Sequence, residues 1–210
     1  MSRTHNNCSM VLRERIRIYI VIMSTGYTLG VTASTHAQGI APAVEVVRSS
    51  RTGEVVFIRN AQGGAIATRA AANAPKATPK DFLQEHGQAF GIQDVSNQLV
   101  EKRNRVDSLG QSHTTFDQVH KGVPVFTGVI KVHQDVAGGV VSANGRFRVV
   151  SPKVPVAAII DEDAAKATGR AALSAPNANA EKIELVIVDT AWYGDFPSGQ
   201  RLAYYLILSD

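Results

Sequence analysis

Alternating polar and apolar residues dominate the stretch from residue 97 to residue 150. In "SHTTFDQVH", Phe116 and Gln118 fall on one side of an extended chain and their neighbours fall on the other, and the longer run "VPVFTGVIKVHQ" is rich in β-branched residues. A period of two over such runs is typical of strands. We therefore predict antiparallel sheet over residues 97–150.

Glycine-containing segments mark the turns of this sheet. Lys121–Gly122 separates the two runs, residues 137–139 follow the second run, and Asn144–Gly145 is a pair that two-residue hairpins favour. Turns at such short intervals predict a meander rather than crossover connections. Further upstream, "VEVVRSS" and "GEVVFIR" predict two or three additional short strands between residues 44 and 70.

A helical period appears in "TPKDFLQEHGQAF", where apolar residues recur every three or four positions. Thr78 or Asp81 can cap the start of this helix, and Pro79 suits its first turn. Gly91 is a plausible C-terminal stop. These local signals predict one helix that ends close to Phe90.

A second helix is predicted after a proline-marked boundary at residues 151–155. "IDEDAAKATGRAAL" is rich in alanine, Asp161 can cap its N-terminus, and Glu162 and Asp163 favour the positive end of the helix dipole. Two apolar runs, "IELVIVDTAWY" and "QRLAYYLILSD", then predict a strand, a turn and a strand.

These elements together predict an α+β fold with two small lobes, each an antiparallel meander packed with a helix. The first lobe covers residues 38–150 and the second covers residues 151–210. The second lobe is expected to be incomplete at its C-terminal end, because one helix and two strands make an incomplete compact unit.

The first 37 residues read as a secretory signal. A basic region ends at Arg17, an uncharged stretch follows, and small residues surround the predicted cleavage between Ala37 and Gln38. The alternative is a membrane anchor, but the apolar core is short, whereas a spanning helix needs about 20 mostly apolar residues. We therefore predict residues 1–37 to be a signal peptide, and the mature protein to have no membrane contact.

The net charge gives little information about partners once residues 1–37 are excluded. The formal charge of the chain is +4, but residues 1–37 hold four arginines and one acid, which leaves 18 basic against 17 acidic residues. No cluster of Lys and Arg with interleaved aromatics remains, so no nucleic-acid partner is expected. The one cysteine, Cys8, would leave with the signal, which suits an oxidising compartment.

Metal binding and nucleophilic catalysis find little support in the sequence. A zinc site needs three or four converging ligands. The candidates His113, His120 and His133 lie on different predicted strands, and neighbouring strands could bring two of them together. We predict no metal and treat these histidines as polar groups of the sheet or its turns. No Gly-x-Ser-x-Gly motif is present, so no catalytic residue is predicted.

A set of residues between Asp107 and Phe147 carries a family resemblance. The set comprises Gly110, His113, Phe116, Gln118, the run Gly122–Phe126, Val132, His133, Asn144 and Gly145. In this pattern the stretch resembles the fungalysin/thermolysin propeptide motif. In addition, "IDEDAAKATGRAAL" resembles the opening helix of a PepSY-type module and "QRLAYYLIL" resembles its strand, so a partial PepSY-like module is expected to follow.

The resemblance implies the N-terminal pro-region of a secreted thermolysin-like zinc metallopeptidase of the M4 type. Such a pro-region looks like an inhibitor and intramolecular folding chaperone of its own enzyme. The expected partner is the cognate catalytic domain, and zinc and calcium are expected only there, with no cofactor in this chain. The sequence contains no His-Glu pair, so this chain is not expected to be an enzyme. Its expected location is extracellular or periplasmic.

Two other interpretations remain open at this point. The chain as given ends without a protease, which favours a free-standing secreted protease inhibitor or a cell-envelope binding module, whereas the unfinished second lobe argues against it. An active peptidase would require a longer precursor. For the pro-region, the meander is the expected protease-contact surface or scaffold, and the alternative is that its residues only build the sheet. The residues concerned are Phe116, Gln118, Val123, Pro124, Val125, Phe126 and His133.

Overall fold

The computed structural model describes residues 17–22, 44–69, 77–193 and 199–209, and they divide into two compact units. One unit lies within residues 30–149, and the other combines residues 150–210 with the N-terminal segment up to residue 29. Helices and sheet occur together with a large share of strand, which confirms the α+β class. The finer prediction of two meander lobes, the second one incomplete, stays a prediction.

The unit within residues 30–149 is built on an antiparallel sheet. Its spatial order is β4-β5-β6-β7-β3-β2, so the strands from β4 to β7 are neighbours in sequence and in space. The strands are β2 (Val44–Arg48), β3 (Val55–Asn60), β4 (Leu99–Val106), β5 (Ser112–His120), β6 (Val123–Gln134) and β7 (Val140–Arg146).

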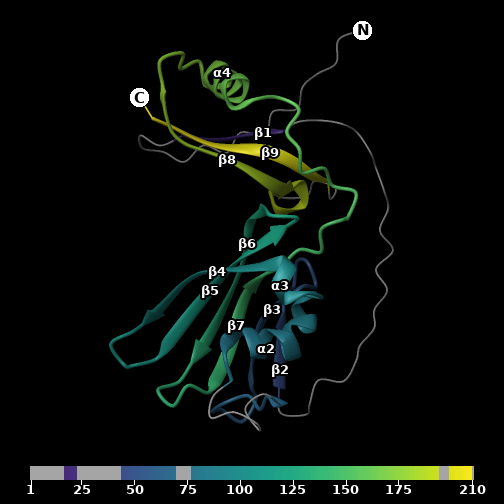
Figure 1. The fold of residues 1–210 in the computed structure, drawn as a ribbon, viewed down its shortest axis with the longest axis vertical. Helices are drawn as coiled ribbons and strands as arrows, with labels where there is room; N and C mark the ends of the chain where they lie inside the picture. The colour runs from purple at the N-terminus through teal and green to yellow at the C-terminus, as the bar shows by residue number, and fades with distance from the viewer. Residues whose placement is uncertain (1–16, 23–43, 70–76, 194–198, 210) are drawn as a thin grey trace. The chain divides into compact units, whose positions relative to one another are not determined.

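One face of this sheet is covered by helices α2 (Pro79–His86), η1 (Gly87–Phe90) and α3 (Val95–Gln98), which gather on the same side (Figure 1). The side chains of Phe82 and Leu83 on α2 are buried against the sheet residues Phe116, Ile130 and Val132. Of the residues that alternate along these strands, one set therefore points into this core, and the other set points to the sheet face away from the helices.

The predicted start and end of this helical segment are confirmed. Thr78 Oγ1 accepts a hydrogen bond from the backbone N–H of Asp81 at 3.1 Å, and the Asp81 side chain accepts one from the N–H of Thr78 at 2.9 Å. This reciprocal pair is a capping box, with Pro79 in the first turn. Gly91 takes a left-handed conformation after η1 and ends the segment.

The interpretation of Asn144–Gly145 as a hairpin turn was wrong. The chain turns at Asp135–Gly139, where the N–H of Asp135 donates to the carbonyl of Gly139, so the predicted turn at residues 137–139 is confirmed. Asn144 and Gly145 lie inside β7, and Gly145 pairs with Ile130 at φ +151. A Cβ on Gly145 would overlap the carbonyl oxygen of Val129, so the glycine serves a close backbone approach.

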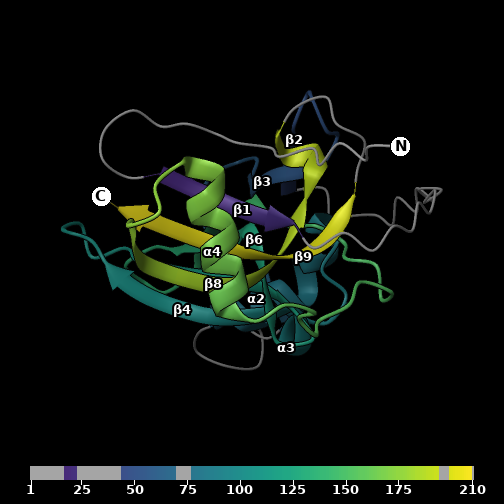
Figure 2. The same cartoon turned by 90° about the horizontal axis from the view of Figure 1, so that it is seen from above.

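The other unit contains α4 (Glu162–Leu173), β8 (Asn179–Asp189), η2 (Thr190–Tyr193) and β9 (Gln200–Ser209) in the predicted order of helix, strand and strand. Asp161 caps α4, as predicted, by accepting from the N–H of Ala164 at 2.8 Å. The helix lies across the strands (Figure 2). Gly169 allows this close packing, since its Cβ would lie 3.1 Å from Leu206.

A strand from the N-terminal segment also joins this second sheet. β1 (Arg17–Ile22) pairs antiparallel with β9, with Arg17 opposite Leu208 and Ile22 opposite Ala203. β1 falls within residues 1–37, and the expected cleavage between Ala37 and Gln38 lies outside the described residues, so the signal peptide stays a prediction. Among the residues that the structure describes, no helix is long and apolar enough to cross a membrane.

Candidate functional site

The most organised polar group of the first unit begins at Asp107, in the turn between β4 and β5. Asp107 Oδ1 accepts hydrogen bonds from the backbone N–H groups of Leu109 at 2.8 Å and Gln111 at 3.0 Å. These bonds fix the carboxylate and leave Oδ2 facing Nε2 of His113 at 3.0 Å. The turn therefore presents one carboxylate oxygen to the first histidine of β5.

His113 and His133 are direct cross-strand partners in the register of β5 and β6. Their Nδ1 atoms lie 2.7 Å apart, and the rings meet edge to face at 67° with centroids 4.9 Å apart. Nε2 of His133 lies 2.7 Å from Oδ1 of Asn144 on β7. The four side chains thus form a continuous hydrogen-bonded chain across three strands, which we call the histidine network: Asp107, His113, His133 and Asn144.

The histidine network lies on the sheet face that the helices leave uncovered. Thr114 and Val132, the sequence neighbours of its two histidines, are 1% and 0% exposed in the core, and alternation turns the histidines to the other side. We call this other side the open face. The hydrogen bond from His113, followed by bonds from the backbone N–H of Gln111, holds the pKa of Asp107 below its ordinary value.

The network has the composition of a binding or proton-sharing element rather than of a metal centre. Within the described residues, no three His, Cys, Asp or Glu side chains converge in the way a metal ion requires. The sequence-based expectation that two histidines could meet is confirmed by His113 and His133, while His120 lies apart. The absence of metal from the whole chain stays a prediction.

His120 ends β5 in a different environment. It pairs with Val123 across the turn at Lys121–Gly122, and its Nε2 atom is buried without a hydrogen-bond partner. Burial, followed by the nearby charge of Lys121, holds its pKa below the ordinary value. A shallow hollow is lined here by Gln93, Asp94, Asn97, Gln98, Val119, His120, Lys121 and Gly122.

The residues predicted as contact or scaffold fall into two groups by burial. Phe116, Gln118 and Val125 are at most 5% exposed, so they build the unit from within. The other four, which are partly exposed, are Val123, Pro124, Phe126 and His133. Their contact with a partner stays a prediction.

Gln118 shows how a buried polar residue holds the sheet together. Its Oε1 accepts from the backbone N–H of Arg148 at 2.9 Å, and its Nε2 donates to the carbonyl of the same residue. Arg148 follows β7, so the amide ties the middle of β5 to the segment that leaves the sheet. Because both backbone groups depend on this amide, the motif glutamine has a structural role.

Sequence reasoning missed the charge of the open face. Lysines and arginines that are scattered along the chain come together only when the strand register is known. Alternation of Arg103 with Arg105, two residues apart, was the available signal, because such residues share one face of a strand. The basic residues on this face are Arg59, Lys102, Arg103, Arg105, Lys131 and Arg146.

Comparison with known proteins assigns part of this unit. Residues 97–147 match the family model described as Fungalysin/Thermolysin Propeptide Motif, and this range includes the whole histidine network. The chain therefore contains a propeptide motif of that kind, as its sequence resemblance predicted.

The other comparisons add no functional information. No curated protein matches the chain. Among solved structures, the Bacillus megaterium YpeB C-terminal domain is 12% identical and aligns with a TM-score of 0.33 over 94% of this chain and 81% of that chain. A likeness at that score supports no argument about function.

Proposed function

We propose that this chain is the pro-region of a secreted thermolysin-like metallopeptidase, which inhibits that enzyme and assists its folding. The observation that carries the proposal is the propeptide motif at residues 97–147. In this proposal the chain has two lobes, a meander lobe followed by a PepSY-like lobe, and performs no catalysis. Zinc and calcium belong to the partner catalytic domain, and the protein acts outside the cytoplasm.

The physical basis of such a role is differential binding. A ligand that binds only the native peptidase stabilises it by mass action, and one that also binds the folding transition state accelerates folding. The covalent link in a precursor raises the effective concentration to about millimolar, so modest contacts suffice. Once the pro-region is removed, slow unfolding alone can protect the enzyme.

The structure supports a scaffold suited to this role. Phe116 and Gln118 of the motif hold the sheet together from inside, while the histidine network of the same motif is displayed on the open face. One stretch of sequence thus supplies both a rigid frame and a polar surface. A surface on regular strands is more precisely positioned than one on loops, which favours recognition of a defined partner.

The test measures inhibition and refolding with the same preparation. The purified chain should slow a thermolysin-like peptidase at about micromolar concentration or below and raise the yield of active enzyme on dilution from denaturant. A matched preparation of the Gly145→Val variant should do neither, because its side chain would overlap the backbone of Val129 and disrupt the pairing of β6 with β7. A wild-type chain that changes neither activity nor refolding would contradict the proposal.

The DNA sequence downstream of the Asp210 codon distinguishes the pro-region hypothesis from that of a free-standing inhibitor or cell-envelope binding module. A His-Glu-x-x-His motif encoded in frame downstream of the Asp210 codon would support the pro-region. A stop codon with no peptidase sequence downstream would favour the free-standing protein.

A further inference from the structure

The open face gathers cations from four different strands. The register places Arg59 on β3, Lys131 on β6 and Arg146 on β7 on this face, and β4 contributes Lys102, Arg103 and Arg105. Three carboxylates lie among them: Glu45 on β2, Asp117 on β5 and Asp107 of the histidine network. Six cations against three carboxylates leave this sheet surface positive, although residues 38–210 taken together are nearly neutral.

Two of these cations are neutralised inside the unit and four are not. Arg59 pairs with Glu45 at 2.7 Å, and Lys102 pairs with Asp117 at 2.6 Å. Among the described residues, no carboxylate lies within ion-pair distance of the remaining four, all of which are exposed: Arg103, Arg105, Lys131 and Arg146.

The register places these unpaired charges close enough to repel one another. Arg103 and Lys131 are both opposite Thr115, one on each side, so they are about 10 Å apart across two strand spacings. That separation is comparable with the Debye length of about 8 Å at physiological salt, so their repulsion is only partly screened. A surface of this kind favours an anionic partner.

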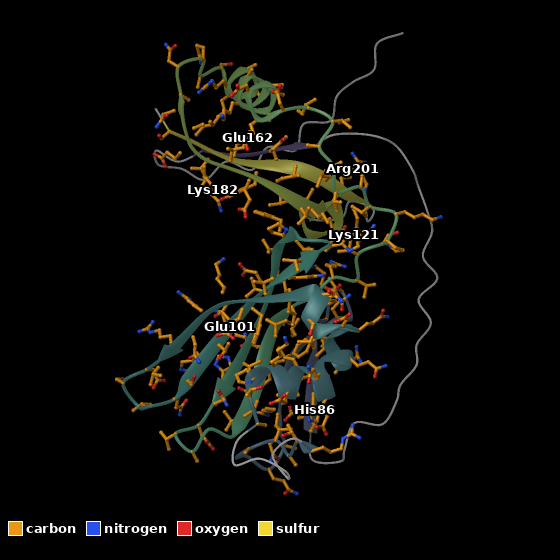
Figure 3. The ribbon with its side chains drawn as sticks, in the orientation of Figure 1. His86, Glu101, Lys121, Glu162, Lys182 and Arg201 are labelled. Atoms are coloured by element: carbon orange, nitrogen blue, oxygen red, sulfur yellow. The ribbon has the colours of Figure 1, made fainter. Side chains whose placement is uncertain are left out.

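The orientation of β4 argues against a role limited to protecting a sheet edge. Charges discourage edge pairing whichever face they occupy. On β4, however, Arg103 and Arg105 point to the open face, while Glu101, which is opposite Phe116, points to the other. Figure 3 shows Glu101 on this outer strand and His86 on the helix side. On β4 the two arginines therefore share one face of the sheet, and the glutamate lies on the other.

We infer that the open face docks on an acidic surface of the partner peptidase, with Arg103, Arg105, Lys131 and Arg146 as the recognition cations. This inference rests on the proposed function and specifies which side of the pro-region meets the enzyme. The histidine network lies in the same array, because Arg105 is opposite His113. Complementary charge accelerates encounter and fixes orientation more than it adds to affinity.

The array fits a protein surface better than a nucleic acid. Asp117 and Glu45 stand among the cations, as in the mixed polar rim of a protein interface, and they would repel a phosphate backbone. Among the residues that the register places on the open face, Phe57 is the one Phe, Tyr or Trp, and it is partly buried. Single-stranded nucleic acids need several exposed aromatic platforms for stacking.

The experiment is charge reversal with a matched control. The test variant carries Arg103→Glu, Arg105→Glu and Lys131→Glu. The control carries Arg51→Glu, Lys80→Glu and Lys153→Glu, which change the net charge equally at exposed positions outside the strands of the open face. Circular dichroism establishes that each variant is folded, and the milder triple change to glutamine serves if the reversal does not fold.

Binding is measured to an immobilised, catalytically inactive thermolysin-type domain at two salt concentrations, and inhibition is measured separately with the active enzyme. The reversal should weaken binding about 30-fold at low salt, the control should stay within about threefold, and wild-type binding should weaken as salt rises. Equal binding by the reversal and the wild type would overturn the docking face and leave the proposed function intact.

The remaining outcomes also decide between the two proposals. Salt-dependent binding that the reversal abolishes, without inhibition or refolding by the wild type, would support the docking face and contradict the inhibitor role. Absence of wild-type binding would overturn both. Tighter binding to a single-stranded DNA oligonucleotide than to the peptidase would overturn the inference in favour of a nucleic-acid partner.

Discussion

Nδ1 of His113 and Nδ1 of His133 lie 2.7 Å apart, so one of the two imidazoles donates a proton to the other. Nε2 of His113 faces a carboxylate of Asp107, and Nε2 of His133 faces Oδ1 of Asn144, and both of these oxygens are acceptors. The three hydrogen bonds need three N–H groups, whereas two neutral rings carry two. The donor and acceptor roles of the two rings therefore depend on the groups at both ends of the network.

The Asn144 amide can present either its oxygen or its NH₂ group to His133. If Nε2 of His133 has no proton, it must accept, and the side-chain NH₂ of Asn144 is the donor within reach. The proton positions on the two rings and the orientation of Asn144 are thus linked, so the histidines should act as a unit rather than as independent surface residues.

A double-mutant cycle tests this coupling. We expect His113→Ala and His133→Ala each to destabilise the protein, and the double variant to lose less than the sum, with an interaction free energy of about 1 kcal/mol. The measurement is the free energy of unfolding in urea for the wild type, both single variants and the double variant. Additive losses would contradict the network.

Asp107 should contribute to stability in a way that depends on acidity. Its folded pKa is lowered, chiefly by the hydrogen bond from His113, so it stabilises the fold above its unfolded pKa. That contribution is lost as pH falls through the folded value. The window therefore starts at about pH 4 and extends downward.

The variant for this test is Asp107→Asn. It should be less stable than the wild type at pH 5. On acidification from pH 5 to pH 3 it should lose less stability than the wild type loses. Both comparisons are made from urea unfolding midpoints. Asp163→Asn, at a side chain that is 93% exposed, is the control and should keep the wild-type dependence on pH. Asp81 and Asp94 also have lowered pKa values, so the variant keeps a residual slope.

Short sequence motifs predicted the structure correctly where it depends on neighbouring residues. They failed where it depends on contact with backbone that is distant in the sequence. The capping box at Thr78 and Asp81 needs only its own four residues, and it is present. Asn144–Gly145 has the local preference of a hairpin, yet it lies inside β7 because Ile130 and its neighbours approach the glycine too closely for any side chain. Tertiary context overrides turn propensity there.

The candidate site was predictable only in part for a related reason. The sequence places His113 and His133 on neighbouring strands, but their contact depends on a register that shifts between Asp117 and Val119. A one-residue change in register would turn one histidine into the core. The cations of the open face depend on four such registers at once, which no periodicity in a single strand reveals.

His120 should oppose folding in mildly acidic solution. Its pKa is lowered by burial first and by Lys121 second, so the unfolded state binds the proton more readily. Stability contributed by the neutral ring is full above about pH 6.5 and is lost as pH falls through the folded pKa.

Replacement of His120 by Phe removes this titration and fills the same space. The variant should lose less stability than the wild type between pH 7 and pH 5, measured by urea unfolding at both values. It should also be at least as stable at pH 7, since Nε2 of His120 is buried without a partner. A steeper loss on acidification than in the wild type would contradict this account.

Gln118 is expected to matter for stability rather than for charge. Gln118→Leu keeps most of the side-chain volume but removes the two hydrogen bonds from its amide to the N–H and carbonyl of Arg148. We expect a loss of about 2–4 kcal/mol in the free energy of unfolding. The exposed Gln88→Leu is the control and should change stability by less than about 0.5 kcal/mol.

Two glycines with positive φ separate backbone strain from steric overlap. Gly122, at φ +85 in the turn after β5, has open space where a Cβ would be, whereas a Cβ on Gly145 would overlap the backbone of Val129. Gly122→Ala should therefore cost about 1–2 kcal/mol through strain alone. Gly145→Ala should cost about 4 kcal/mol or more, because β6 and β7 must separate to admit the methyl group. Urea unfolding of both variants measures the difference, and equal losses would show that the close approach of Gly145 to β6 is not what requires glycine in the motif.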